Sequence, residues 1–169
     1  DHDCTDRIVG GYAMLDGKVA CAADDIAIST VETWHDEVKG AKRGADIVFC
    51  FLVDGIKVVH MGDVGFVDDN VVRATKGCDV LLLPVGGVYT VDAKGAAEYV
   101  RQISPRIVVP MHYMTDLHKF TLDPLSDFLS ECVANGWNVK QAGTDTLRLD
   151  DVPQNESTEV VVLDRYTED

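Results

Sequence analysis

The chain has 169 residues, of which 46% are hydrophobic and 26% are charged, and its formal net charge at pH 7 is −14. This length suits one domain, spanning residues 1–169, with enough chain to bury a core. The negative charge argues against nucleic acid as a partner, because nucleic-acid phosphates attract clustered Lys and Arg. No apolar run reaches the roughly 20 residues of a membrane span, so we expect no membrane partner.

The first half of the chain is predicted to contain helices and β-strands. The segment DRIVGGYAML, residues 6–15, can start a helix, and DIAISTVETW, residues 25–34, has the β-branched alternation of a strand. The next segment, residues 45–63, contains two β-rich runs joined at Asp54–Gly55, a dipeptide that favours hairpin turns. A short helix is predicted over Asp68–Lys76.

Two strands in the second half are predicted to be buried on both faces. DVLLLPV and RIVVPMH, residues 79–85 and 106–112, are nearly continuous apolar runs, which is typical of strands in parallel sheets. Three short strands should finish the chain, at residues 138–143, 146–149 and 159–163.

Helices are predicted to follow each of the two buried strands. TVDAKGAAEYVRQIS, residues 90–104, has an apolar stripe at helical spacing, with Thr90 or Asp92 as its N-cap. DPLSDFLSECVANG, residues 123–136, carries Pro near its first turn and Gly136 as its C-terminal stop. Interleaved strands and helices of this kind predict an α/β domain with a mixed sheet.

The five cysteines show no CxxC pairing. Cys50 and Cys132 lie in a predicted strand and a predicted helix, and we interpret them as small buried hydrophobes in a reducing compartment. The chain opens polar and acidic, unlike a signal peptide, so we expect a cytoplasmic protein. Because residue 1 is not Met, we also expect the native chain to start earlier.

Metal-ligating residue types collect at the ends of three predicted strands. His35 ends the first strand, His60 and Asp63 follow the hairpin, and His112 ends the strand RIVVPMH. A single histidine at a strand end is usually structural, but ligands bind where the carboxyl ends of strands in an α/β sheet meet. His2, Cys4 and Asp6 alternate at the start of the chain; imidazole, thiolate and carboxylate together suit Zn²⁺.

Several motifs together resemble the metallo-β-lactamase superfamily, in particular its small lactonase-like branch of metal-dependent hydrolases. WHDEVKGAKRG, VVHMGDVG, LLLPVGGVYTVDAKGA and IVVPMHY match that branch in order and spacing, and the resemblance covers nearly the whole chain. The family's first motif, H-x-H-x-D-H, is altered here to His-Asp-Cys-Thr-Asp-Arg over residues 2–7. The resemblance implies an α/β fold, the αββα sandwich with mixed sheets, and this chain would lack its first strands.

The resemblance also implies a set of metal ligands. The first metal position would take His2, Cys4 and His35, and the second would take Asp6 and His112. Asp63 would bridge both positions. The implied cofactor is zinc, as one or two ions, with Mn or Fe as alternatives.

One departure from the pattern concerns Arg7, which stands where dinuclear members of the family have a histidine. A guanidinium cannot ligate a metal, so the second position is reduced to Asp6, Asp63 and His112. His60, Arg7, Tyr89 and Arg43 are predicted to support the ligands or contact substrate.

The implied activity is metal-assisted hydrolysis of a small-molecule substrate, an ester, lactone or phosphorylated metabolite, with Asp6 and Asp63 as the catalytic carboxylates. The alternative is a catalytically impaired member of the same fold that serves as a binding or assembly module. Strands missing from one sheet would uncover apolar runs of the other, so we also expect a homo-oligomer.

Overall fold

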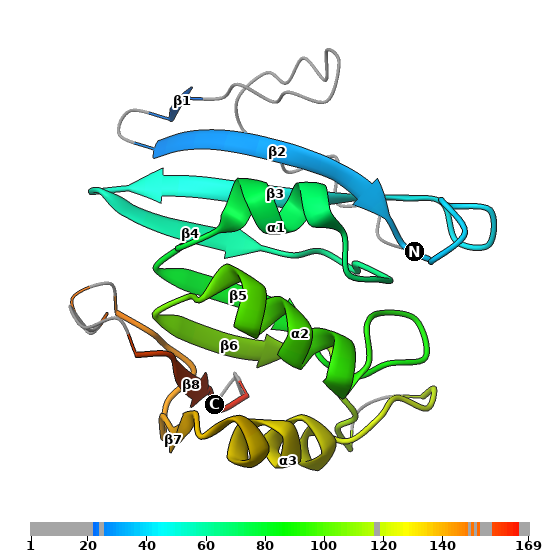
Figure 1. The fold of residues 1–169 in the computed structure, drawn as a ribbon. Coiled ribbons are helices and arrows are strands. Elements are labelled where there is room, and N and C mark those ends of the chain that lie inside the picture. Colours follow the sequence, from blue (N-terminus) through cyan, green and yellow to red (C-terminus); the bar gives the residue numbers. More distant parts are fainter. Residues whose placement is uncertain are drawn as a thin grey trace.

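The computed structural model describes residues 22–23, 26–116, 119–148, 150, 152 and 157–165. Eight strands form one sheet in the order β1-β2-β3-β4-β5-β6-β8-β7 (Figure 1). The strands are β1 (Ala22–Ala23), β2 (Ile26–Trp34), β3 (Ala45–Val53), β4 (Ile56–His60), β5 (Val80–Pro84), β6 (Ile107–Met111), β7 (Asn138–Gln141) and β8 (Glu159–Val162). The predicted helix at residues 6–15 lies outside the described residues.

The sheet is mixed, as the sequence predicts. Strands β1 to β4 pair antiparallel, and β4, β5, β6, β8 and β7 pair parallel in that order. The turn between β3 and β4 contains Asp54 and Gly55, both at positive φ, which confirms the predicted hairpin. The α/β class is therefore confirmed, and the described strands all belong to one sheet.

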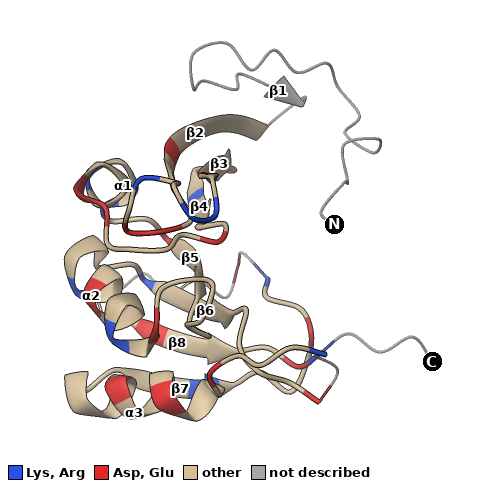
Figure 2. Ribbon diagram, turned by 90° about the vertical axis from the view of Figure 1, so that its right-hand side faces the viewer, with Lys and Arg blue, Asp and Glu red and all other residues tan. Residues whose placement is uncertain are grey.

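Three helices cover one side of this sheet (Figure 2). They are α1 (Asp69–Thr75), α2 (Ala93–Ile103) and α3 (Leu125–Asn135). Asp92 is the N-cap of α2 and accepts a hydrogen bond from the Gly95 N–H, which decides between the two predicted caps. Gly136 ends α3 in the left-handed conformation, as predicted. None of the described helices has both the length and the apolar character needed to cross a membrane.

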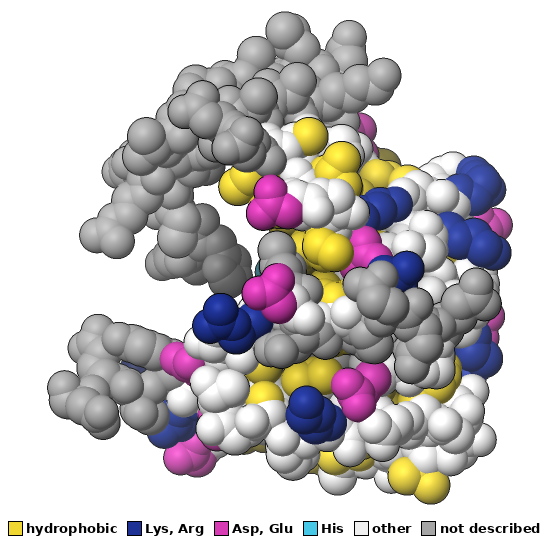
Figure 3. Space-filling model, turned by 90° about the vertical axis from the view of Figure 1, so that its left-hand side faces the viewer, with side chains coloured by type: hydrophobic (Ala, Val, Ile, Leu, Met, Phe, Trp, Pro, Cys, Tyr) yellow, Lys and Arg dark blue, Asp and Glu magenta, His cyan; other side chains and the backbone are white. Residues whose placement is uncertain are grey.

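The main core lies between the sheet and the helices. Tyr99 and Phe128 from α2 and α3 are fully buried there, against alternate strand residues such as Val48 and Leu81. Cys50 and Cys132 are also buried, as predicted. At the end of the sheet where the β3–β4 hairpin turns, hydrophobic side chains reach the surface (Figure 3).

The strand predicted at residues 146–149 was wrong over its described part. Residues 146–148 form no strand, and Leu149 lies outside the described residues. The neighbouring strand β8 already pairs with β6 on one edge and β7 on the other. Both edges of β8 are therefore occupied, and the segment does not pair with the outer edge of β7, the last strand of the sheet.

Candidate functional site

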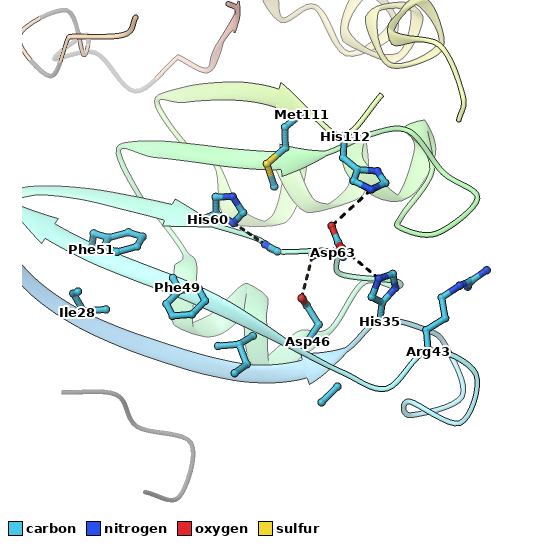
Figure 4. A pocket seen from close by; sticks show the side chains of 13 residues that line it. Ile28, His35, Arg43, Asp46, Phe49, Phe51, His60, Asp63, Met111 and His112 are labelled. Atoms are coloured by element: carbon cyan, nitrogen blue, oxygen red, sulfur yellow. Dashed lines mark hydrogen bonds and ion pairs between the residues drawn. The ribbon is translucent and has the colours of Figure 1, made fainter. Parts of the chain in front are cut away.

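Three side chains meet at the edge of the sheet where β2, β4 and β6 end. His35 Nε2 lies 3.4 Å from Asp63 Oδ2, and His112 Nε2 lies 3.8 Å from Asp63 Oδ1 (Figure 4). Each histidine thus faces a different oxygen of the same carboxylate. The structure brings together the three strand-end residues that the sequence analysis singled out as metal ligands.

Backbone hydrogen bonds hold the three strand ends together. The Gly65 N–H donates to the Trp34 carbonyl at 3.1 Å, which ties the loop of Asp63 to the end of β2. The Val85 N–H donates to the Met111 carbonyl at 3.0 Å, which ties the end of β6 to β5. The positions of the site residues are therefore set by the sheet and not by their side chains alone.

The Asp46 side chain holds the backbone of Asp63 in place. The sequence analysis did not identify Asp46 as a site residue. Its Oδ1 accepts a hydrogen bond from the Asp63 N–H at 3.0 Å. Gly62, at φ +60°, lies so close to Asp46 that a Cβ there would collide with the carboxylate. Burial raises the pKa of Asp46, and the nearby Asp63 carboxylate raises it further. The sequence shows Asp46 only as a carboxylate near the start of an apolar strand. Because its partner Asp63 is 17 residues away, no local pattern pointed to this contact.

His112 sits on a strained backbone with a φ of +52°, which is uncommon for a residue with a side chain. Its carbonyl group packs against Gly86, where any Cβ would collide with the carbonyl oxygen. Gly86, the first residue of the pair of glycines that follows β5 and Val85, therefore has a specific role. It lets the backbone of His112 approach the end of β5.

His60 lies beside the site without facing Asp63 directly. Its Nδ1 accepts a hydrogen bond from the Gly62 N–H at 3.0 Å, so the ring holds the turn that precedes Asp63. Burial lowers the pKa of His60, which favours the neutral ring that this acceptor role requires. This contact agrees with a supporting role.

Asp36, next to His35, organises a loop and does not face the site. Its two oxygens accept hydrogen bonds from the backbone N–H groups of Val38, Gly40, Lys42 and Arg43, at 2.7–3.0 Å. The side chain is buried, and these four bonds use both oxygens. Its role is to shape the loop that presents Arg43.

Among the described residues, two cavities open beside the three site residues. The larger, about 1080 Å³, runs along the side of the sheet away from the helices, past Phe49 and Phe51. The smaller, about 460 Å³, is lined by the three site residues together with Arg43, Tyr89 and Phe120. Cavities of this size suit small molecules.

The remaining predicted residues fall into two groups. Arg43 and Tyr89 line the smaller cavity, as a role in substrate contact requires. His2, Cys4, Asp6 and Arg7 lie outside the described residues.

The described side chains at the site supply some of the donor atoms that a metal ion needs. Both distances to Asp63 exceed those of ordinary hydrogen bonds, and imidazole nitrogen with carboxylate oxygen is a donor set that suits zinc. Nδ1 of His35, Nδ1 of His112 and Oδ2 of Asp46 are buried with no hydrogen-bond partner among the described residues. Within the same residues, no group of three or more His, Cys, Asp or Glu side chains has the spacing to hold a metal ion. The described part of the chain thus supplies part of a ligand set.

Comparison with known proteins identifies the family of this chain. A family model described as "Beta-lactamase superfamily domain" matches residues 1–112. A metal-dependent hydrolase of Alkaliphilus metalliredigens is 32% identical over 113 residues, which are 67% of this chain and 49% of that protein. One of Thermoplasma acidophilum is 46% identical over 89 residues, 52% of this chain and 39% of that protein. The chain therefore spans about half the length, or less, of these curated relatives.

A solved structure from Thermotoga maritima agrees with the fold. It is provisionally described as a Zn-dependent hydrolase of the metallo-β-lactamase superfamily. The two structures superpose with a TM-score of 0.71 at 32% sequence identity, over 97% of this chain and 79% of the other. A metal-dependent hydrolase fold from Parabacteroides distasonis, at 18% identity, superposes with a TM-score of 0.55.

Proposed function

Because the chain belongs to the β-lactamase superfamily, we propose that it carries part of the active site of a metal-dependent hydrolase. The observation that supports this most strongly is the meeting of His35, Asp63 and His112 at one edge of the sheet. Three different strand ends deliver these donors, and each histidine faces its own oxygen of Asp63. The names of the relatives agree with this chemistry.

In this proposal His35, Asp63 and His112 hold the metal, which we expect to be zinc. His2, Cys4 and Asp6 would complete the ligand set, as the order of the first motif implies. A bound zinc ion supplies activated water at neutral pH and polarises an oxygen of the substrate.

Other side chains would hold the ligand Asp63 in place, and a carboxylate would orient the attacking water. Asp46 fixes the backbone of Asp63, and His60 fixes the turn before it. Asp6 or Asp63 would orient the attacking water or take its proton. The substrate would be a small ester, lactone or phosphorylated metabolite, a size that the two cavities can accept.

A second candidate is a binding or assembly module that keeps the fold but has lost hydrolysis. The replacement of two histidines of the first motif by Cys4 and Arg7 favours it. The two candidates differ in their metal content, because a module without catalysis needs no metal.

Metal analysis of the purified protein tests the proposal. We expect about one or two equivalents of zinc per chain in the parent protein. The variant Asp63→Ala should lose this metal together with any hydrolysis of p-nitrophenyl esters, a homoserine lactone and bis-p-nitrophenyl phosphate. Elemental analysis by mass spectrometry and a plate assay provide the two measurements.

The matched control is Asp127→Ala, which removes an exposed carboxylate from α3, a helix that lines neither cavity. This variant should keep both metal and activity. A parent protein without metal, or metal retained in Asp63→Ala, would contradict the proposed site.

A further inference from the structure

We propose that Arg43, Tyr89 and Phe120 form a recognition subsite for small organic anions that carry an aromatic or flat apolar group. The orientation of this subsite toward a reacting bond rests on the proposed function, but anion binding itself does not. The three residues and the three proposed metal ligands line one cavity of about 460 Å³. A molecule held by the subsite would therefore lie against the proposed reaction centre.

The guanidinium of Arg43 has unused capacity to bind an anion. One nitrogen donates to the Val88 carbonyl at 2.8 Å, and the group lies over the Tyr89 ring at 5.4 Å from its centroid. Within residues 26–116 and the other described segments, no carboxylate forms an ion pair with it. A guanidinium has five N–H donors and binds carboxylate or phosphate through two of them at once.

The backbone of Arg43 is held firmly, although its side chain is exposed. Its N–H donates to Asp36 at 2.7 Å, within the set of four bonds that shape this loop. The neighbouring Lys42 makes a different use of its charge, because it pairs with Glu37 on the same loop. Of these two adjacent cations, Arg43 lines the cavity and Lys42 does not.

Two aromatic rings form the apolar part of the subsite. Tyr89 and Phe120 come from different loops, and their rings meet edge to face at a centroid distance of 5.8 Å. They remain 39% and 47% exposed, so the pair presents apolar surface to the cavity instead of burying it in the core. Exposed aromatic surface beside a cavity is available for ligand contact.

The loop that carries Tyr89 is also strained. Val88, a β-branched residue, has a φ of +57°, and its carbonyl is the group that accepts the hydrogen bond from Arg43. Strain of this kind persists where surrounding contacts hold it, often at ligand sites. A cation and an aromatic pair are thus kept at fixed positions on one wall of the cavity.

Binding of simple probes tests the subsite directly. Phenylacetate and phenyl phosphate carry the proposed anion and ring, and phenylacetamide is a neutral counterpart of the first. In NMR titrations of the protein as purified, both anions should bind about tenfold or more tightly than the amide. Whichever anion binds more tightly identifies carboxylates or phosphates as the preferred class.

Three variants distinguish binding at the subsite from nonspecific attraction of an anion by positive charge. Arg43→Met should weaken binding of both anions about tenfold or more, because it removes a charge-assisted hydrogen bond, and Tyr89→Ala should weaken all three probes. Lys42→Met removes the same charge from the same loop and should leave binding unchanged. Equal losses in the Arg43 and Lys42 variants, or none in Arg43→Met, would overturn the proposal.

A second titration with a chelator present keeps this test independent of the proposed function. The difference between parent and Arg43→Met should persist after metal removal, with both proteins showing native circular dichroism. If that difference appears only with metal bound, the anion is held by the metal and the subsite is overturned. Hydrolysis can fail in the earlier experiment without affecting this result.

Discussion

The two faces of the sheet differ in what they do for the protein, although the same strands build both. In β3, Val48 and Cys50 face the helices and are buried, whereas Ile47, Phe49 and Phe51 face the other way and are only partly buried. The partly buried residues line the larger cavity, which reaches the proposed metal ligands. The helix-covered face supplies packing. The other face is also packed at β5, β6 and β8, where Val80, Ile107 and Val161 are buried, but at β3, beside the site, it supplies accessible chemistry.

The largest expected effect is a loss of packing on the helix-covered face. Phe128 is fully buried in α3, so Phe128→Ala should lower the free energy of unfolding by about 3–5 kcal/mol. Phe49→Ala, on the other face, removes a side chain that is only partly buried and should cost less than half as much. Urea denaturation of both variants measures the difference. Equal losses would mean that the two faces contribute alike to stability.

A smaller loss of stability is expected from a substitution at Gly86, which lies against the His112 carbonyl group. Gly86→Ala would drive a Cβ into the His112 carbonyl, so we expect a loss of about 1–3 kcal/mol in the free energy of unfolding. The displaced histidine should also weaken any metal binding, which elemental analysis would detect.

The control for this substitution is Gly95→Ala in α2. A Cβ there would lie 3.2 Å from the Val91 Cβ, and alanine favours the helix by about 0.5–1 kcal/mol. We expect little change in the free energy of unfolding and unchanged metal content. A loss as large as that of Gly86→Ala would show that close packing at His112 is not the cause.

The smallest effect concerns the acid stability of the loop that presents Arg43. Burial alone would raise the pKa of Asp36, but its four backbone hydrogen bonds outweigh burial and hold the pKa below its usual value of 3.8. Between the native pKa and 3.8, the Asp36 carboxyl group is protonated in the unfolded chain but stays ionised in the native protein. The bonds at Asp36 therefore stabilise the native state above this pH, and the stabilisation disappears as the pH falls through the native pKa.

Thermal melts between pH 2 and pH 6 test this dependence. Asp36→Asn should flatten the fall in melting temperature on the acid side, because the titrating group is gone. Asp127→Asn is the control: it removes an exposed carboxylate from α3, outside this loop. The same flattening in both variants would assign the acid response to general charge.

The sequence by itself determined the local structure well. Asp54–Gly55 specified the hairpin, Gly136 specified the end of α3, and continuous apolar runs specified the buried strands β5 and β6. These signals depend on neighbouring residues alone, because backbone conformation and hydrophobic periodicity are local properties. For the same reason, His35, Asp63 and His112 could be identified as residues at strand ends.

Only the tertiary structure decided which distant groups meet. Asp46 supports Asp63 across the β3–β4 pairing, and Arg43 reaches the Val88 carbonyl from 45 residues away. No local pattern encodes such contacts, since they depend on strand order and on loops that cross the edge of the sheet. Residues 146–148, which form no strand, show the same limit, because strand propensity is local and does not decide whether a segment pairs with a sheet.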